Sequence, residues 1–286
     1  MGIPFLKGHG TENDFIVLPD LDAGLDLTAG RVRALCDRRR GLGADGVLRV
    51  VRAKAVADAP PDVDDDAWFM DYRNADGSIA EMCGNGVRVF ARYLAEAGLE
   101  RSSEFTVCSR AGARPVEIRP DGDVTVYMGP VRVLGRSVAA VGGANFPGVA
   151  VDVGNPHLVC VLDGGLDDLD LTVQPGFDAA LFPNGVNVEF VVAAGPDHVR
   201  MRVHERGVGE TRSCGTGTIA AAAAVLHQQD TPTGRVTVDV LGGRLQVGID
   251  EEASTLTGPA VLVARGELDS VWWRDLAGHG QVGRTQ

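Results

Sequence analysis

The sequence of 286 residues lacks the features that mark several classes of protein. Its five cysteines are widely spaced, with no Cys-x-x-Cys pair and no histidine at the spacing of a zinc ligand, which argues against a disulfide framework or a structural metal. No apolar run reaches the length of a membrane span, and the first residues lack the apolar segment of a signal peptide. We therefore expect a cytoplasmic protein with reduced thiols.

Positive charge is also scarce. The formal net charge is −12 and the isoelectric point is about 4.9, which argues against a nucleic acid as partner. One short basic run, Arg38-Arg39-Arg40, is expected to be a solvated surface patch. The few lysines, Lys7 and Lys54, lie in no evident phosphate-binding context, so no pyridoxal phosphate site is expected. We expect a small-molecule substrate, with no nucleic acid, membrane, metal or cofactor.

Two cysteines stand where a glycine-rich turn becomes a helix. Cys83 and Cys214 are each followed by Gly-x-Gly and then by a helical pattern. A thiol at a helix N-terminus faces unpaired backbone N–H groups and the positive end of the helix dipole, which favour the thiolate. The pattern predicts two reactive thiols. The other cysteines, Cys36, Cys108 and Cys160, lie in apolar or strand-like surroundings and are expected to be buried and inert.

The two halves of the chain are similar to each other, which indicates an internal duplication. Asn74 and Glu205 each lie nine residues before the cysteine of their half. Two more pairs of segments correspond: Asn13-Asp14-Phe15-Ile16-Val17 with Asn155-Pro156-His157-Leu158-Val159, and Gly46-Val47-Leu48 with Asn187-Val188-Glu189. The first half is longer, largely because of an acidic loop, Asp58–Asp66, that we expect to be exposed.

The duplication predicts an α+β fold of two pseudo-symmetric domains, each a β-barrel-like sheet wrapped around a central helix. The Ala-rich run Ile219–Leu226 has no polar face, so its helix should be enclosed by its own sheet. A further helix is predicted over residues 28–39 with Thr28 as N-cap. One strand is predicted over Val151–Val161, and disorder over Ala277–Gln286.

A pair of thiols can invert a carbon that carries a weakly acidic hydrogen. Inversion needs a base on one face of the carbon and an acid on the other, and a thiolate and a thiol supply both. Two thiols close together titrate as a coupled pair, because the first negative charge opposes the second. The backbone N–H groups at Gly84-Asn85 and Gly215-Thr216 form cradles for an amino-acid carboxylate on which negative charge develops. Such cradles partly replace an electron-sink cofactor.

Several motifs, in order and over almost the whole chain, resemble those of the diaminopimelate epimerase family. They are GHGTENDF, NADG with MCGNG, GNPH, VNVEF, and HERGVGET with SCGTG. The resemblance implies an isomerase that interconverts LL- and meso-2,6-diaminopimelate without a cofactor, in lysine and peptidoglycan biosynthesis. It also implies that the last strands return to the first domain, which gives one half of residues 1–128 plus 264–286 and another of residues 129–263.

The resemblance implies roles for single residues. Cys83 and Cys214 would be the acid and base and exchange roles with the direction of reaction, while His157 and Glu205 would tune the thiol pKa values. The residues implied to bind substrate are Asn13, Asn74, Gly84, Asn85, Asn155, Asn187, Glu205, Arg206, Gly215 and Thr216. A homodimer is implied as well. Two positions depart from the family: Gly46 replaces a common glutamine, and Ala264 a tyrosine that supports the dimer in many bacterial members.

Other interpretations stay open. An epimerase or racemase of another amino acid, such as proline or hydroxyproline, would use a comparable cysteine pair, although Arg206 and the asparagines favour a substrate with a second amino-acid end. A non-catalytic module that binds an anion at the two helix starts would not need the thiols. Glu205 and Arg206 could form a plain surface ion pair, and the asparagines could be turn residues. Oxidation of Cys83 and Cys214 to a disulfide is expected as an inactivating side reaction.

Overall fold

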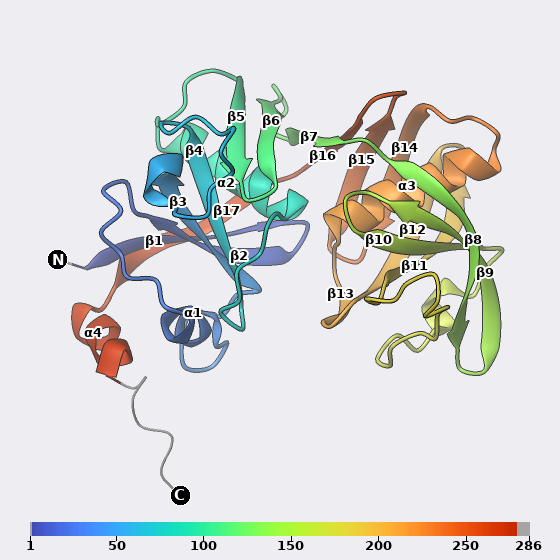
Figure 1. Ribbon diagram of the computed structural model, residues 1–286, viewed down its shortest axis with the longest axis horizontal. Helices are drawn as coiled ribbons and strands as arrows, with labels where there is room; N and C mark the ends of the chain where they lie inside the picture. Colours follow the sequence, from blue (N-terminus) through green and yellow to red (C-terminus); the bar gives the residue numbers. More distant parts are fainter. Residues whose placement is uncertain (1, 279–286) are drawn as a thin grey trace, which may run out of the picture. The chain divides into compact units, whose positions relative to one another are not determined.

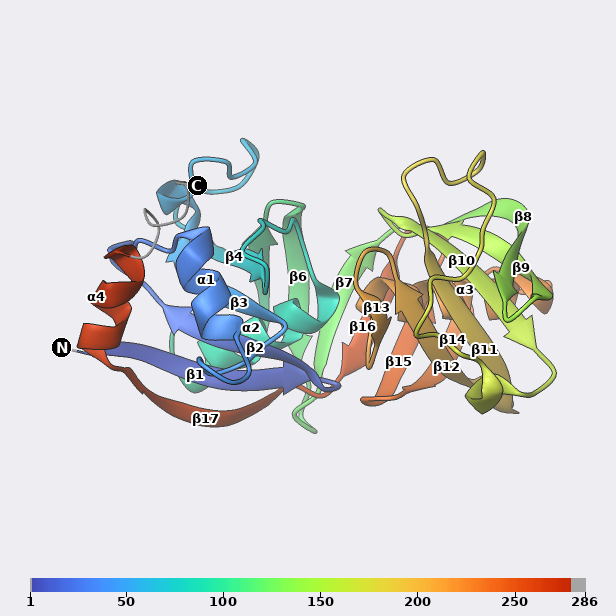
Figure 2. The ribbon, with the colours of Figure 1, turned by 90° about the horizontal axis from the view of Figure 1, so that it is seen from below.

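The computed structural model describes residues 2–278, whose contacts divide them into two compact units (Figure 1). Unit 1 comprises the described residues up to Gly10, then Asp14–Val124 and the chain from Ala260 onward. Unit 2 comprises Thr11–Asn13 and Thr125–Pro259. Each unit is a curved sheet around one long helix, which confirms the predicted α+β fold class (Figure 2). Over residues 2–278, every helix is too short or too polar to cross a membrane.

Unit 1 is built around helix α2. Its strands are β1 (Ile3–Gly10), β2 (Asn13–Pro19), β3 (Gly46–Arg52), β4 (Trp68–Asn74), β5 (Glu104–Ser109), β6 (Gly112–Ile118) and β17 (Val261–Leu268). Its helices are α1 (Ala29–Cys36), α2 (Gly84–Glu96), α4 (Ser270–Gly278) and the 3-10 turn η1 (Ala53–Ala55). β2 and β3 pair in parallel, as do β4 and β5, whereas β1–β17, β3–β4 and β5–β6 are antiparallel. This sheet contacts α2 through β1, β3 to β6 and β17.

Unit 2 is built in the same way around helix α3. Its strands are β7 (Val124–Gly129), β8 (Arg132–Val141), β9 (Ala144–Asp152), β10 (Pro156–Leu162), β11 (Asn187–Gly195), β12 (His198–Glu205), β13 (Gly209–Thr211), β14 (Gly234–Val240), β15 (Gly243–Ile249) and β16 (Ser254–Gly258). Its helices are η2 (Leu166–Asp168) and α3 (Gly215–Gln228). β10–β11 and β12–β14 are parallel, and β8–β9, β9–β10, β11–β12, β14–β15 and β15–β16 antiparallel. α3 contacts β8 to β12 and β14 to β16.

The registers of the two sheets match the repeat in the sequence. In unit 1, Phe15 of β2 lies opposite Gly46 of the parallel strand β3. In unit 2, His157 of β10 lies opposite Asn187 of the parallel strand β11. The next strands also agree, because Val47 is opposite Arg73 and Val188 is opposite His204. Equivalent positions of the two halves therefore have equivalent places in the two sheets, as the duplication predicts.

The central helix of unit 2 is enclosed because its side chains are small and apolar. All of the fourteen residues of α3 are buried except Thr216, His227 and Gln228. A run of alanines adds little bulk, so strands can approach the helix on every side. The prediction that Ile219–Leu226 lies inside its own sheet is confirmed.

Two predicted elements differ in length from those observed. The helix predicted over residues 28–39 is capped by Thr28 but ends at Cys36. It ends early because Asp37 Oδ1 accepts hydrogen bonds from the backbone N–H groups of Arg39 and Arg40, which forms a turn that competes with the helix. The strand predicted over Val151–Val161 is two strands, separated by a turn at Gly154 with φ +88°.

The C-terminal segment is ordered further than predicted. Disorder was expected from Ala277, but α4 extends through Gly278, and residues 279–286 lie outside the described residues. Asp269 Oδ1 accepts hydrogen bonds from two backbone N–H groups at the start of α4. Trp273 on this helix is buried against α1, where Arg31 lies over its ring. This apolar contact holds α4 on unit 1.

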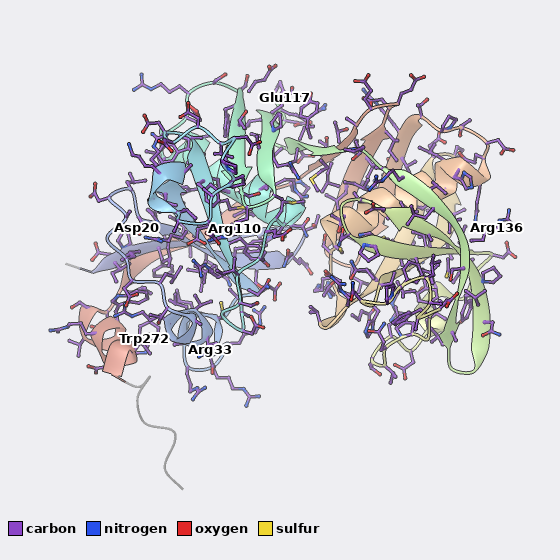
Figure 3. The ribbon with its side chains drawn as sticks, in the orientation of Figure 1. Asp20, Arg33, Arg110, Glu117, Arg136 and Trp272 are labelled. Carbon is purple, nitrogen blue, oxygen red and sulfur yellow. The ribbon has the colours of Figure 1, made fainter. Side chains whose placement is uncertain are left out.

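The charged surface segments are more structured than their composition indicates. Arg38 is not a free surface cation, because its Nη2 donates to Asp14 Oδ1 at 2.7 Å and to Asp45 Oδ1 at 2.8 Å. The acidic loop is largely exposed, as predicted. Its first residue, Asp58, accepts a hydrogen bond of 2.8 Å from Arg110, whose place is marked in Figure 3.

Candidate active site

Cys83 and Cys214 are the N-cap residues of the two central helices, as predicted. Cys83 has φ −146° and ψ 118°, and Cys214 has φ −122° and ψ 116°, so both have the same extended backbone conformation. Each sulfur accepts a hydrogen bond of 3.4 Å from the backbone N–H three residues later, at Gly86 and Gly217. A side-chain acceptor at this position satisfies one of the free donors of the first helical turn.

The second glycine of each Cys-Gly-x-Gly motif lets the helix start lie directly on the sheet. A Cβ at Gly86 would lie 3.3 Å from Leu48 Cδ2 and 3.6 Å from Phe15 Cζ. At Gly217 it would lie 2.6 Å from Glu189 Oε1 and 3.3 Å from Cys214 Sγ. One equivalent sheet position thus supports both helix starts, and its side chain is apolar in unit 1, at Leu48, and polar in unit 2, at Glu189.

A cluster of ionisable side chains surrounds Cys214. Glu189 and His157 are each 0% exposed, and Glu189 Oε1 lies 2.7 Å from His157 Nδ1. The other ring nitrogen of His157, Nε2, lies 3.0 Å from Asn155 Oδ1. Glu205 ends β12, accepts a hydrogen bond from Thr211 Oγ1, and lies against the Cys214 thiol. The predicted pKa-tuning residues His157 and Glu205 are therefore both in the group around this cysteine.

The surroundings of Cys214 keep its thiol protonated. Burial raises the pKa of Cys214 well above its ordinary value, and the carboxylates of Glu205 and Glu189 raise it further. Hydrogen bonds from Thr216 and from the Gly217 N–H lower the pKa of Cys214, but by less. The helix start does favour the thiolate of Cys214, through the Gly217 N–H, but burial and the two carboxylates outweigh it. Burial also raises the pKa of Glu205.

A buried cation interacts with Cys83. Cys83 is half-buried above the apolar side chains of Phe15 and Leu48. Arg88, one turn further along α2, is completely buried. Burial lowers the pKa of Arg88 to about 10, and the Cys83 and Asp123 charges partly offset this effect. A buried cation therefore acts on Cys83, where Cys214 has carboxylates.

The structure gathers the predicted substrate-binding residues into two groups. Gly84 and Asn85 form the first turn of α2 in unit 1, and Gly215 and Thr216 form the first turn of α3 in unit 2. Asn74 ends β4 in unit 1, where its Nδ2 donates to Ser78 Oγ at 3.0 Å. The others, Asn13, Asn155, Asn187, Glu205 and Arg206, belong to unit 2.

Two of the predicted binding residues also support the local backbone. Asn187 Oδ1 accepts a hydrogen bond of 2.9 Å from the Arg206 backbone N–H. The Arg206 guanidinium is exposed and donates to the Asn184 carbonyl at 2.8 Å. Among the residues that the structure describes, no ion pair joins Arg206 to Glu205, so the interpretation as a plain surface ion pair is wrong. The Arg206 guanidinium keeps donors available for a carboxylate.

Sequence reasoning missed three residues of these groups. Glu189 stands in the VNVEF motif and aligns with Leu48 of the first half. A carboxylate in one half where the other half has an apolar residue could have marked Glu189 as a functional residue. Thr211 holds Glu205, and Arg88 lies beneath Cys83. No pattern in the sequence distinguishes those two from ordinary strand and helix residues.

The remaining cysteines are buried, as predicted. Burial raises the pKa of Cys36 and of Cys160 to about 12, which makes their thiols inert at neutral pH. Cys108 is buried too, and burial raises its pKa. In residues 2–278 no three metal-ligating side chains come together in a possible ion site.

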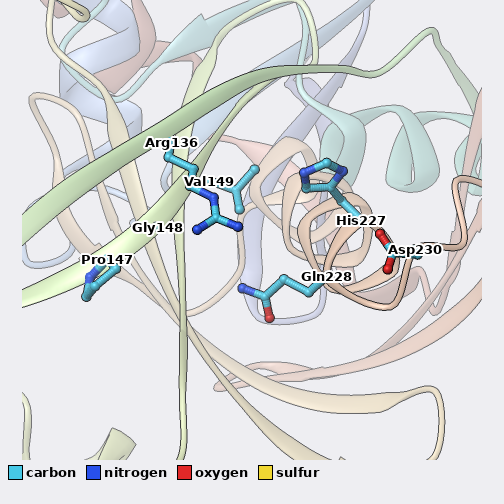
Figure 4. Close-up of a pocket in the computed structure, with 7 residues that line it drawn as sticks. All are labelled: Arg136, Pro147, Gly148, Val149, His227, Gln228 and Asp230. Atoms are coloured by element: carbon cyan, nitrogen blue, oxygen red, sulfur yellow. The ribbon is translucent and has the colours of Figure 1, made fainter.

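A hollow of about 620 Å³ lies at the other end of α3 (Figure 4). His227, Gln228 and Asp230 form one side, and Arg136, which reaches in from β8, forms another (Figures 3 and 4). The fourteen residues of α3 separate it from Cys214. At about 1.5 Å per helical residue this is roughly 20 Å. The hollow is therefore distinct from the cysteine site.

Comparisons with known proteins agree with the fold and the motifs. The sequence matches the family described as diaminopimelate epimerase over residues 5–134 and 149–263. A diaminopimelate epimerase of Rhodococcus erythropolis is 58% identical over 286 residues, which cover 95% of this chain and 98% of the relative. A diaminopimelate epimerase of Mycolicibacterium smegmatis is 58% identical over 289 residues, covering 96% and 99%.

Solved structures share the fold at low sequence identity. A probable proline racemase from Agrobacterium radiobacter has a TM-score of 0.65 at 17% identity and covers 94% of this chain and 93% of its own. A hydroxyproline epimerase from Agrobacterium vitis has a TM-score of 0.60 at 18% identity and covers 95% and 94%. These two similarities concern the fold alone.

Proposed function

Because the chain belongs to the diaminopimelate epimerase family, we propose that it interconverts LL- and meso-2,6-diaminopimelate with Cys83 and Cys214 as base and acid. The chain is an isomerase by its family. The finer statement, that two thiols do the chemistry without a cofactor, rests on the two N-cap cysteines and on the charges around them. The opposite charges around the two thiols are the observation that carries this proposal.

The proposed reaction begins with one ionised and one protonated thiol. The Cys83 thiolate removes the α-hydrogen of one amino-acid end, and the electron pair of the broken C–H bond is left on the α-carbon and its carboxylate. The Cys214 thiol then gives its proton to the opposite face of the same carbon. The product has inverted configuration, and the enzyme now carries a Cys83 thiol and a Cys214 thiolate. The reverse reaction starts from that state.

The charges around the two cysteines support this division of roles. Carboxylates and burial keep the proton on Cys214 in the free enzyme. The buried guanidinium of Arg88 favours a negative charge on Cys83. With one thiol held neutral, the pair avoids two adjacent negative charges. A resting enzyme with the base at Cys83 and the acid at Cys214 follows from these environments.

We further propose that the helix starts stabilise the intermediate. The N–H groups of Gly84, Asn85, Gly215 and Thr216 would bind the reacting carboxylate as its charge grows. Loss of one such donor typically costs ~10²–10³ in rate. No cofactor is then required to accept the electron pair.

The far amino-acid end of the substrate requires polar groups of its own. We assign it to Arg206 and to the asparagines Asn13, Asn74, Asn155 and Asn187. An exposed guanidinium can bind a carboxylate with two parallel hydrogen bonds. Proline has no second amino-acid end and would leave these groups without a partner.

The setting of the enzyme is also a proposal. We place the reaction in the cytoplasm, in the supply of lysine and of peptidoglycan precursors. A homodimer is proposed from the family alone, since Ala264 replaces the tyrosine that supports it in many members.

The test is α-hydrogen exchange in heavy water. Reduced protein is incubated with LL-diaminopimelate and no added cofactor, and the deuterium content of the α-carbon and the LL-to-meso ratio are followed. We expect both to change with the wild-type chain, and both rates to fall at least ~10²-fold in Cys83→Ala and in Cys214→Ala.

The matched control is Cys108→Ala, which removes a buried thiol away from the helix starts and should exchange at close to the wild-type rate. Turnover of proline in place of diaminopimelate would contradict the assigned substrate. Full exchange in either catalytic variant would contradict the two-thiol mechanism.

A further inference from the structure

Glu189 on β11 is a buried carboxylate whose local role is not explained by folding alone. Its side chain is 0% exposed. One oxygen, Oε1, accepts a hydrogen bond from His157 Nδ1 at 2.7 Å. The other, Oε2, is buried without a hydrogen-bond partner among the residues that the structure describes. Burying a carboxylate in this way opposes folding, and such groups are retained mostly where function needs their charge.

Glu189 reaches the Cys214 helix start through the space that glycine leaves. A Cβ on Gly217 would lie 2.6 Å from Glu189 Oε1 and 3.3 Å from Cys214 Sγ. Because Gly217 has no side chain, the Glu189 carboxylate can lie close to the Cys214 sulfur. The matching space in unit 1, under Gly86, is filled by the methyl group of Leu48.

The titratable groups facing Glu189 come from two neighbouring strands and one helix start. They are His157 and Cys160 on β10, Glu205 on β12, and Cys214 at the start of α3. His157 Nδ1 must carry a proton to donate to the Glu189 carboxylate. The other ring nitrogen, Nε2, lies beside the side-chain amide of Asn155. Glu189 thereby fixes both the orientation of the ring and the position of its proton.

We infer that Glu189 is a positioning residue of the Cys214 end of the site, which holds the proton on Cys214 and orients His157. This inference rests on the proposed two-thiol function. A negative charge next to the sulfur disfavours the thiolate in the free enzyme. Once Cys214 has given its proton away, the same charge makes the thiolate a stronger base for the reverse reaction. Glu189 itself does not contact the reacting carbon.

The experiment is the rate of thiol alkylation as a function of pH, measured for each cysteine by mass spectrometry with iodoacetamide and no substrate. In the wild type, Cys214 should label more slowly than Cys83 at pH 7, and the midpoint of its labelling curve should lie at higher pH. A wild-type midpoint for Cys214 at or below that of Cys83 would overturn the inference, whatever any variant does.

Glu189→Gln removes the charge and keeps an oxygen that can accept from His157. In this variant, Cys214 labelling at pH 7 should speed up at least ~tenfold, with its midpoint at lower pH, while the Cys83 curve stays in place. Glu189→Leu copies Leu48 of unit 1, loses the acceptor too, and should also lower kcat through His157. Glu189→Asp, which keeps the charge, should restore slow labelling.

The matched control is Glu210→Gln in the same unit, whose carboxylate pairs with Arg202 at 2.6 Å. Its Cys214 curve should match the wild type. If Glu189→Gln folds and labels at the wild-type rate, the inference fails even when diaminopimelate is turned over. If labelling shifts as expected but the wild type exchanges no diaminopimelate hydrogen, the proposed function fails and the link between Glu189 and Cys214 stands.

Discussion

Behind Cys83, the sheet position that supports the helix start is occupied by Leu48, whereas the equivalent position behind Cys214 is occupied by Glu189. The backbone of the two starts is the same, with a cysteine N-cap and an N–H···S hydrogen bond of 3.4 Å in each. The charges differ in sign: Arg88 is buried in α2, and Glu189 and Glu205 lie around Cys214.

This contrast shows what the duplication kept and what it changed. Identical surroundings at the two helix starts would make the two thiols equivalent. The charges near the two sulfurs differ, because Glu189 and Glu205 disfavour a thiolate at Cys214 whereas the buried Arg88 interacts with Cys83. The shared geometry places a cysteine at each helix start, and the changed supporting side chains give the two cysteines different surroundings.

The largest expected effect comes from removing the cation of unit 1. Arg88→Met should slow iodoacetamide labelling of Cys83 at pH 7 at least ~tenfold, because the thiolate loses a buried positive charge. Cys214 labelling should not change. Arg88→Lys keeps the charge and should recover most of the rate.

Arg92→Met is the control for this experiment, since Arg92 lies on the same helix and pairs with Glu96 at the surface. It should label like the wild type. A folded Arg88→Met chain with wild-type Cys83 labelling would show that the contrast in charge does not govern the thiols.

A smaller effect is expected from filling the two glycine positions. Gly217→Ala should lose ~1–3 kcal/mol of unfolding free energy, because its Cβ would lie 2.6 Å from Glu189 Oε1 and the carboxylate must move. Gly86→Ala should be close to neutral, since its nearest contact is a flexible leucine methyl at 3.3 Å and alanine favours the helix by about 1 kcal/mol.

Urea unfolding and epimerase turnover measure this difference. Turnover should fall much further in Gly217→Ala than in Gly86→Ala. Equal losses of stability and turnover in the two variants would mean that Glu189 and Leu48 support their helix starts in the same way. That result would contradict the contrast between the two units.

The smallest expected effect concerns the pH dependence of stability through Glu205. Burial raises its pKa in the folded state, so the folded chain holds a proton that the unfolded chain releases as the pH passes the ordinary carboxyl value. The contribution of Glu205 to the free energy of unfolding is therefore most favourable below that pH, and it is lost as the pH rises.

Glu205→Gln removes this proton linkage. Relative to the wild type, its unfolding free energy should rise as the pH increases from about 4 to 7. Urea denaturation at several pH values measures the difference. A difference that is constant with pH, or that falls as the pH rises, would contradict the raised pKa.

Much of the site could be predicted from the sequence. The Cys-Gly-x-Gly motifs placed Cys83 and Cys214 at helix starts, and the repeat placed His157 and Asn187 at positions that the strand registers confirm. Such features are local, because a glycine-rich turn and an apolar run specify a helix start wherever they occur. The alanine run of α3 likewise determined that this helix would be enclosed.

The early end of α1, the turn at Gly154 and the helix after Asp269 were not predicted. Each depends on a side-chain oxygen, a positive φ or a packing contact that competes with the periodic pattern. Each of these interactions involves only a few residues, and whether it forms depends on how the surrounding chain is folded.

The sequence by itself determined which two cysteines stand at helix starts and which positions of the two halves are equivalent, because both follow from spacing along one chain. Only the tertiary structure decided the charges around the thiols. The pKa of Cys214 depends on burial and on Glu189 and Glu205, which come from separate strands. Electrostatic energy depends on distance in space and on exposure to water, and neither is set until the strands have closed around the helix.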